Sequence, residues 1–149
     1  WVYGVVRQES AFVVDARSSA GALGLMQLMP STGRLTGRKI KMPIHNNRSI
    51  LNIENNLRLG ASYLKEVLGR NNGNQVLATA SYNAGPNRVN SWLPNRNMEA
   101  DIWVELIPFS ETRDYVKNVM SYTTVYDHRL GSRPVRLRQR MMDIEPREK

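Results

Sequence analysis

One segment of the chain, residues 75–81, is apolar on nearly every side of the helix that it predicts. A helix of this kind is buried on all sides, so other parts of the chain have to surround it. The flanking residues are typical of helix ends, since Asn74 can cap the start and Gly85, followed by Pro86, stops one helix and begins the next. We therefore predict a domain built around a buried central helix.

The other hydrophobic patterns also predict helices. One long helix follows the N-cap Asn52, with an apolar face formed by Ile53, Leu57, Ala61, Leu64 and Leu68. Another runs from Glu111 to about Arg129 after the N-cap Ser110, with an inward face formed by Tyr115, Val116, Val119, Met120, Thr123 and Tyr126. Shorter helices are expected at the N-terminus and over residues 31–35, 86–93 and 102–106, the second of them ending at Gly37. Residues 42–44 leave room for at most a small β hairpin.

The length of 149 residues predicts a single folded unit. We expect residues 1–128 to form the domain and residues 129–149 to form a basic C-terminal extension, whose seven basic and three acidic residues supply +4 of the total charge of +8. Because the sequence starts at Trp1 without a methionine, we expect a further N-terminal domain before it. No apolar run approaches the roughly 18 residues of a membrane span, so no span is predicted in this portion.

The charge and the residue types restrict the chemistry. A net charge of +8 favours anionic surroundings such as nucleic acid, a membrane surface or an acidic cell-wall polymer. Nucleic acid is disfavoured, because the basic clusters lack interleaved aromatic residues and any recognisable nucleic-acid motif. Cysteine is absent, and His45 and His128 stand alone, so no disulfide, metal site or cofactor is predicted. The sequence also lacks a phosphate loop and a nucleophile elbow.

Glu9 is the residue with the most unusual position. It continues the apolar face of the first helix, which contains Val2, Val5 and Val6. Burial on that face disfavours the charged carboxylate, so the pKa of Glu9 should rise toward the range that a general acid needs. The alternative is that Glu9 turns toward solvent at the helix end or pairs with Arg7 or Arg17.

Glycoside cleavage normally uses two carboxylates, and Glu9 has no obvious partner. Asp15 lies in the next loop, while Glu105 and Glu111 could approach Glu9 only through the fold. A mechanism with one acid, in which the substrate supplies the nucleophile, therefore has to be considered.

Gln27, the polar residue in the apolar run 25–30, is either a satisfied buried amide or a group that binds a ligand.

Four ordered motifs resemble those of the soluble lytic transglycosylase family, glycoside hydrolase family 23, and most closely the catalytic C-terminal domain of the Slt70 type. They are Glu9-Ser10, Gly24-Leu25-Met26-Gln27-Leu28-Met29-Pro30, Ser81-Tyr82-Asn83-Ala84-Gly85-Pro86 and Ile107-Pro108-Phe109-Ser110-Glu111-Thr112-Arg113-Asp114-Tyr115-Val116. The resemblance extends from about Trp1 to Tyr126. The segment after Arg129 and the basic loop near Lys39 match no family motif.

The resemblance implies a lysozyme-like, mostly helical (α+β) domain that lies in the bacterial cell envelope, in the periplasm. It implies cleavage of the β-1,4 bond between N-acetylmuramic acid (MurNAc) and N-acetylglucosamine (GlcNAc) in peptidoglycan, without water, to give a 1,6-anhydromuramyl end. Glu9 would be the single catalytic acid and base, which suits a pKa near neutrality. The expected partners are glycan strands with peptide stems.

The same resemblance assigns roles to further residues. Ser18 and Tyr82 match family positions near the acid or the acetamido group of the substrate. The positions that line the glycan groove in the family correspond to Gln27, Met29, Asn83 and Glu111. A first-turn position at a helix N-terminus also explains Glu111 without any ligand. Two alternatives stay open, a hydrolytic muramidase on the same scaffold and a non-catalytic peptidoglycan-binding domain.

Overall fold

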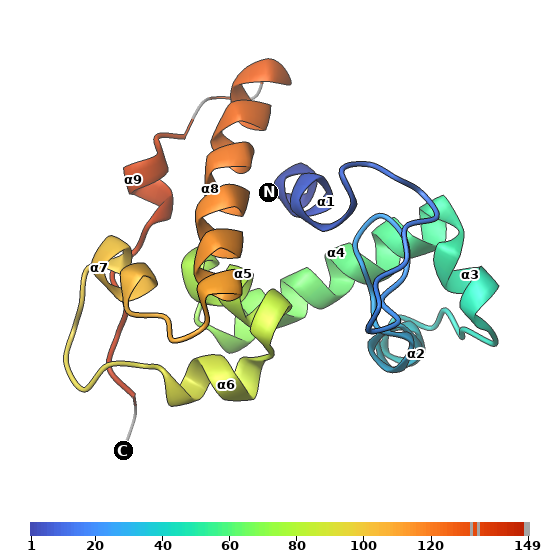
Figure 1. Ribbon diagram of the computed structural model, residues 1–149, viewed down its shortest axis with the longest axis horizontal. Coiled ribbons are helices and arrows are strands. Elements are labelled where there is room, and N and C mark those ends of the chain that lie inside the picture. The colour runs from blue at the N-terminus through green and yellow to red at the C-terminus, as the bar shows by residue number, and fades with distance from the viewer. Residues whose placement is uncertain (132, 134, 148–149) are drawn as a thin grey trace.

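The computed structural model describes residues 1–131, 133 and 135–147. The helices in this part of the chain are α1 (Val2–Ser10), α2 (Pro30–Lys39), α3 (Asn47–Leu51), α4 (Ile53–Arg70), α5 (Gln75–Ala84), α6 (Pro86–Ser91), α7 (Ala100–Glu105), α8 (Ser110–Arg129) and α9 (Leu137–Arg140) (Figure 1). Among the described residues, β structure is limited to isolated bridges that pair Arg17 with Leu23, Leu23 with Leu28 and Met98 with Ile144. The predicted fold class, a mostly helical single domain, is confirmed. None of the described helices has the length and apolar character needed to span a membrane.

Helix α5 is the buried helix that the sequence predicts. Residues 76–81 are all buried, and Figure 1 shows α5 where α4, α6 and α8 meet. The side chain of Asn74 caps its start by accepting hydrogen bonds from the backbone amides of Val76 and Leu77, both at 3.1 Å. Gly85 ends it with a φ of 90°, a left-handed conformation that favours glycine. The helix includes Tyr82 and Asn83, so a rigid element positions both side chains.

Helix α1 lies between α8 and the loop that leads to α2 (Figure 1). Val5 and Val6 enter a core cluster with Leu64 and Val67 of α4 and with Tyr115 and Val119 of α8. Gly4 allows the close approach of α1 and α8, because a Cβ at this position would lie 2.5 Å from Oγ1 of Thr123. The end of α1, which carries Glu9, is therefore held directly against α8.

One local prediction between α1 and α4 is wrong, and one helix there was not predicted. Helix α2 extends to Lys39, beyond the predicted range of residues 31–35, and contains Gly37 in its interior. A Cβ on Gly37 would lie 2.5 Å from the carbonyl oxygen of Met42, so this glycine serves close packing and does not end the helix. Residues 42–44 form no strand, which is within the predicted limit of at most a small hairpin. Helix α3 was not predicted, and Asn46 caps it through a hydrogen bond from the backbone amide of Ser49.

The prediction for α4 is correct at the start of the helix and partly wrong in its buried face. Asn52 caps the helix, but Ile53 is 51% exposed. The buried residues are Asn56, Leu59, Gly60, Leu64 and Val67. Apart from Leu64, this face was not predicted, because its centre holds a polar side chain and a glycine, which the apolar pattern does not count. At α8, Ser110 is the first helical residue and makes no side-chain cap.

The described part of the C-terminal segment folds back onto the domain. Ile144 is fully buried and pairs with Met98, and the amide nitrogen of Asn74 donates to the carbonyl oxygens of Met142 and Asp143. Arg140 forms an ion pair with Asp127 near the end of α8. Residues 135–147 therefore cover α5 and α8, while a domain boundary near residue 128 stays a prediction.

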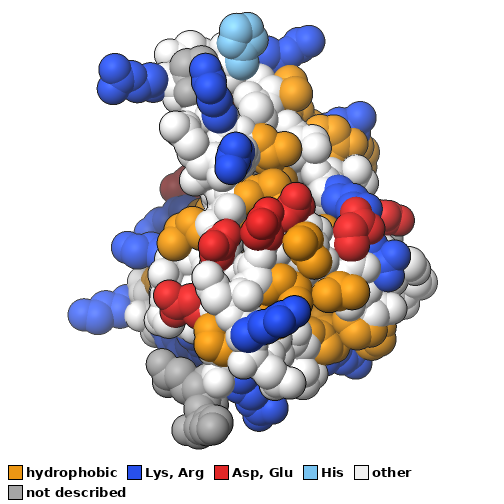
Figure 2. Space-filling view, turned by 90° about the vertical axis from the view of Figure 1, so that its left-hand side faces the viewer, with side chains coloured by type: hydrophobic (Ala, Val, Ile, Leu, Met, Phe, Trp, Pro, Cys, Tyr) orange, Lys and Arg blue, Asp and Glu red, His pale blue; other side chains and the backbone are white. Residues whose placement is uncertain are grey.

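The basic surplus is not spread evenly over the surface. Figure 2 shows the face of α7 and α9, where acidic side chains gather near the middle and basic side chains surround them. Glu99, Asp101 and Glu105 are exposed on α7 or directly before it. This face is therefore less suited to an anionic polymer than the net charge suggests.

We predict opposite effects for the same substitution at two glycines of α4. Gly60→Ala should lower the free energy of unfolding by about 1–3 kcal/mol, because the new Cβ would overlap the sulfur of Met26 and lie 2.8 Å from its Cβ. Gly69→Ala should raise it by about 0.5–1 kcal/mol, because nothing lies within 4 Å of the added Cβ and alanine favours the helix. Urea denaturation measures both, and equal effects would contradict the close packing of α4 on Met26.

Candidate active site

Glu9 lies at the end of α1 and is only partly exposed. The hydroxyl of Tyr115 on α8 donates a hydrogen bond of 2.7 Å to its Oε1. The other oxygen, Oε2, has no partner among the described residues and is not one of the buried unpaired atoms, so it contacts solvent. One carboxyl oxygen is thus held by the protein, and the other is open to a ligand.

The environment of Glu9 raises its pKa from 4.5 to about 7. Burial is the largest cause, because it disfavours the charged form. The hydrogen bond from Tyr115 acts in the opposite direction by stabilising the carboxylate, and the charge of Glu111 raises the pKa further. Both protonation states of Glu9 are therefore accessible near neutral pH, which suits a group that both donates and accepts a proton.

The alternative in which Glu9 pairs with an arginine is wrong. No ion pair joins Glu9 to Arg7 or Arg17 in the part of the chain that the structure describes. The guanidinium of Arg7 lies over the ring of Tyr122 instead, at 5.6 Å from its centroid. Among the described residues, the charged form of Glu9 therefore has no salt-bridge partner that would lower its pKa.

The loop between α1 and α2 is tied to the end of α1 and to α5. The hydroxyl of Ser10 donates to the carbonyl oxygen of Leu25 at 2.8 Å, and the hydroxyl of Tyr82 donates to that of Met26 at 2.8 Å. Tyr82 also lies close enough to Glu9 for the carboxylate to add to the effect of burial, and together they raise the pKa of Tyr82 well above its usual range. Tyr82 is therefore a neutral donor beside the candidate acid.

Gln27 has a fixed amide. Its Nε2 donates to the carbonyl oxygens of Ala16 and Gly24, at 3.1 and 2.9 Å, and its backbone is in the left-handed region at φ 47°. The Oε1 atom has no partner among the described residues and is not buried, so it faces solvent as an acceptor. One end of the Gln27 amide thus braces the loop, and that the other end binds a ligand stays a prediction.

Asn83 and Glu111 lie on two helix ends, those of α5 and α8, which a hydrogen bond joins. The hydroxyl of Thr112 on α8 donates to Oδ1 of Asn83 at 2.8 Å, which joins the last turn of α5 to the first turn of α8. Glu111, next to Thr112, is exposed and acts on the pKa of Glu9 through its charge. Asn83 is thus joined to the turn of α8 that carries Glu111.

Ser18 and Met29 belong to the loop side. The hydroxyl oxygen of Ser18 accepts a hydrogen bond of 2.9 Å from the backbone amide of Ala22, which stabilises a turn. Met29 directly precedes α2 and is 42% exposed. The described contacts place neither side chain against Glu9, so their roles toward a substrate stay predictions.

Three residues of the site were missed from the sequence. Tyr115 was assigned only to the inward face of α8, although a tyrosine on an apolar face needs a partner for its hydroxyl. Thr112 and the buried Asn56 were not singled out. A polar residue within a buried helix face is the signal that could have identified them, because such a group has to be paired.

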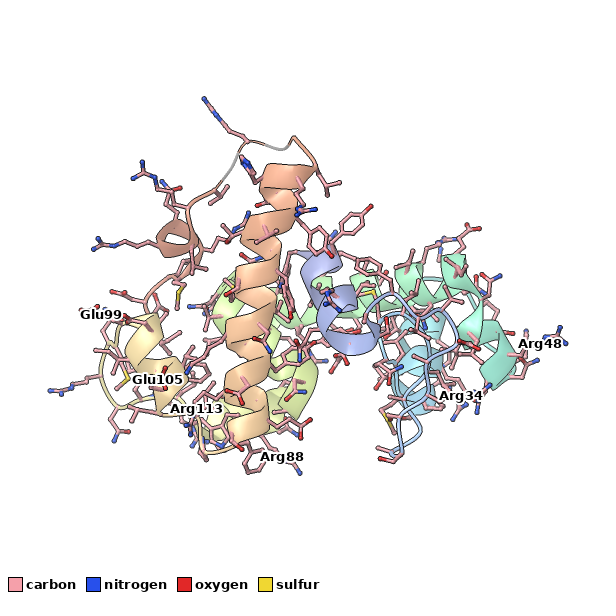
Figure 3. The ribbon with its side chains drawn as sticks, turned by 45° about the horizontal axis from the view of Figure 1, so that its top comes forward. Arg34, Arg48, Arg88, Glu99, Glu105 and Arg113 are labelled. Atoms are coloured by element: carbon pink, nitrogen blue, oxygen red, sulfur yellow. The ribbon has the colours of Figure 1, made fainter. Side chains whose placement is uncertain are left out.

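Arginines lie on both sides of the molecule. Figure 3 shows Arg88 beside the N-terminal end of α8, and Arg34 and Arg48 on α2 and α3 at the opposite side. The guanidinium of Arg88 lies over the ring of Phe109 at 5.4 Å from its centroid.

Among residues 1–131, 133 and 135–147, no group of three His, Cys, Asp or Glu side chains is arranged to hold a metal ion.

Comparison with known proteins agrees with the motifs. Residues 1–104 match the family model of the transglycosylase SLT domain, and residues 106–134 match that of the soluble lytic transglycosylase helical domain. The chain belongs to the SLT transglycosylase domain family. The family resemblance inferred from the four sequence motifs is therefore confirmed.

Individual proteins are similar to this SLT domain over most of its length. The soluble lytic murein transglycosylase of Escherichia coli K12 is 41% identical over 137 residues, which are 90% of this chain and 21% of that protein. Two crystal structures superpose on 95% of the chain. An inactive glutamate-to-glutamine mutant of lytic transglycosylase Slt from Pseudomonas aeruginosa has a TM-score of 0.88 and 48% identity, and the 70-kDa Escherichia coli soluble lytic transglycosylase has 0.84 and 39%. The chain spans 24% and 23% of these two proteins.

We predict that two substitutions shift the pKa of Glu9 in opposite directions from about 7. Tyr115→Phe should raise it, because the hydrogen bond that favours the carboxylate is lost. Glu111→Gln should lower it, because a neighbouring negative charge is removed. Carbon-13 NMR titration of the Glu9 carboxyl measures both shifts directly and does not depend on activity. Shifts of the same sign would contradict this electrostatic arrangement.

Glu9 should also make stability depend on pH. Because its pKa is raised in the folded state, the folded protein binds more protons than the unfolded chain between about pH 4.5 and pH 7. The contribution of Glu9 to the free energy of unfolding is therefore fully present below this interval and is lost as the pH rises through it. The difference in free energy of unfolding, Glu9→Gln minus wild type, should therefore be larger at pH 8 than at pH 4, by up to about 3 kcal/mol. Urea denaturation at both pH values tests this, with Glu99→Gln as an exposed control that should show no such difference.

Proposed function

We propose that this domain is a lytic transglycosylase that cleaves the β-1,4 bond between MurNAc and GlcNAc of peptidoglycan and leaves a 1,6-anhydromuramyl end. The single observation that carries the proposal is Glu9, a partly buried acid with a pKa of about 7 and one oxygen open to solvent. The names of the relatives support the reaction. The inactive glutamate-to-glutamine mutant among the similar structures supports a carboxyl group as the essential one.

The reaction follows from one carboxyl group that changes its protonation state. Protonated Glu9 gives its proton to the glycosidic oxygen, while the acetamido oxygen of MurNAc attacks the anomeric carbon and forms an oxazolinium ion. The bond to GlcNAc breaks, and GlcNAc leaves with the proton. The Glu9 carboxylate then takes the proton of the 6-hydroxyl, whose oxygen attacks the anomeric carbon, opens the oxazolinium ring and closes the anhydro ring. Glu9 is protonated again at the end, and no water is consumed.

The protein groups around Glu9 support both steps. Tyr115 holds Oε1, so proton transfer falls to Oε2, which has no partner among the described residues and is not fully buried. Tyr82 is a neutral donor near the acid, and we propose that it and Ser18 lie near the acetamido group. We assign the walls of the glycan groove to Gln27, Met29, Asn83 and Glu111. Partial burial of Glu9 keeps its proton available at neutral pH.

A hydrolytic muramidase is the second candidate, and Glu111 is the observation that favours it. Glu111 is exposed and close enough to raise the pKa of Glu9, so it could act as a second carboxylate that activates water. Hydrolysis would give a reducing muramyl end, which differs from an anhydro end by one water. A non-catalytic binder would give neither product.

The surroundings of the domain are part of the proposal. We propose that it acts in the bacterial cell envelope, in the periplasm, on glycan strands that carry peptide stems. The basic surplus of +8 suits a polymer whose stems and lactyl groups carry carboxylates. The chain covers 21% of the Escherichia coli relative, and we propose that it is likewise joined to a further N-terminal domain.

We predict that Glu9→Gln lowers kcat by at least about a hundredfold, because glutamine cannot transfer the proton. Glutamine keeps the size and the acceptor for Tyr115, so folding and glycan binding should persist. The same substitution at exposed Glu99 is the control and should leave activity unchanged. Mass spectrometry of digested peptidoglycan identifies the product. An anhydro end supports transglycosylation, a reducing end establishes the muramidase, and full activity of Glu9→Gln would refute the role of Glu9.

A further inference from the structure

We infer that Thr112 is a positioning residue that fixes the amide of Asn83 as a hydrogen-bond donor toward the bound glycan. This inference rests on the proposed function and names a group that would bind the substrate in the same site. Thr112 is only 2% exposed, and its hydroxyl donates to Oδ1 of Asn83 at 2.8 Å. The bond connects two rigid helices, α5 and α8, which the core already holds in place.

The hydrogen bond decides which end of the Asn83 amide is available. An asparagine amide has an acceptor oxygen and a donor nitrogen, and rotation by half a turn exchanges them. In the structure the hydroxyl of Thr112 donates to the oxygen. A hydroxyl can also accept, but Thr112 is buried and has no other acceptor among the described residues, so the opposite amide orientation would leave its hydroxyl hydrogen unpaired. The orientation in which Oδ1 accepts is therefore favoured. The Nδ2 of Asn83 has no partner among the described residues and is not one of the buried unpaired atoms, so it contacts solvent.

The fixed donor selects the chemistry of its ligand. Nδ2 can bind only a group that accepts a hydrogen bond, which on a glycan is the carbonyl oxygen of an acetamido group or a hydroxyl oxygen. Gln27 has the opposite polarity, because its nitrogen is tied to the loop and its oxygen is open. The two amides of the site are therefore fixed in advance as one donor and one acceptor, and little orientation is left to be ordered when the glycan binds.

A purely structural role for Thr112 makes a different prediction. A buried threonine can serve packing alone, and valine has nearly the same shape but no hydroxyl. Serine keeps the hydroxyl and loses a methyl group. Thr112→Val should therefore impair glycan binding with little effect on the melting temperature, and Thr112→Ser should restore it. If packing were the only role, serine would be the more harmful substitution.

The experiment measures binding in the Glu9→Gln protein, so that no substrate is consumed. The probes are β-1,4-linked N-acetylglucosamine oligomers and the same oligomers without acetyl groups, and calorimetry gives the dissociation constant. We expect Thr112→Val to weaken binding of the acetylated oligomer by about tenfold, as for loss of an oriented hydrogen bond, and Thr112→Ser to restore it within about twofold. Thr124→Val, on the same helix, removes a hydroxyl that bonds the carbonyl oxygen of Met120 and should leave binding unchanged.

The outcomes separate the possibilities. A loss of binding confined to the acetylated oligomer identifies an acetamido carbonyl as the partner of Asn83, and an equal loss with both oligomers identifies a hydroxyl. In a Thr112→Val protein, the further change Asn83→Ala should add little, because the oriented donor is already lost. Unchanged binding by Thr112→Val, or no restoration by serine, would overturn this inference alone. No binding of either oligomer by Glu9→Gln would overturn the glycan site itself and this inference with it.

Discussion

The site depends on one buried amide, that of Asn56 in the middle of α4. Its side chain is fully buried, accepts from the backbone amide of Met26 at 2.8 Å, and donates to the carbonyl oxygens of Leu23 and Ile50, both at 3.0 Å. A buried loop backbone without such partners would lose the full solvation of its polar groups, roughly 1–3 kcal/mol for each. Asn56 thus allows an irregular segment to lie inside the domain, where Gly24 makes room for it.

The chemistry of Glu9 follows from this packing. The loop that Asn56 holds supplies the carbonyl oxygens of Leu25 and Met26, which receive the hydroxyls of Ser10 and Tyr82. These bonds close the space around the end of α1, and burial then raises the pKa of Glu9. A single carboxyl group with a pKa of about 7 can serve as acid and as base, so the proposed reaction needs no second carboxylate.

Much of the fold was predictable because its determinants are local. Asn52, Asn74 and Gly85 mark helix ends through hydrogen bonds and backbone angles that involve only neighbouring residues. The predictions were wrong where a distant contact decides. Gly37 is typical of a helix end but lies inside α2, where the backbone of Met42 packs closely against it. The buried face of α4 contains Asn56 and Gly60, and both are suited to burial only because the loop with Gly24 and Met26 packs against them.

The sequence by itself determined the helical class, the family and the position of Glu9 on an apolar face, because periodicity and motifs depend on residues close together in the chain. Only the tertiary structure decided how Glu9 is held. Tyr115 and Thr112 are remote in sequence from the groups that they bind, and which oxygen of Glu9 or which end of Asn83 stays open depends on those contacts. Hydrogen-bond partners and burial are properties of the packed chain, so the pKa of Glu9 and the polarity of the groove amides are set there.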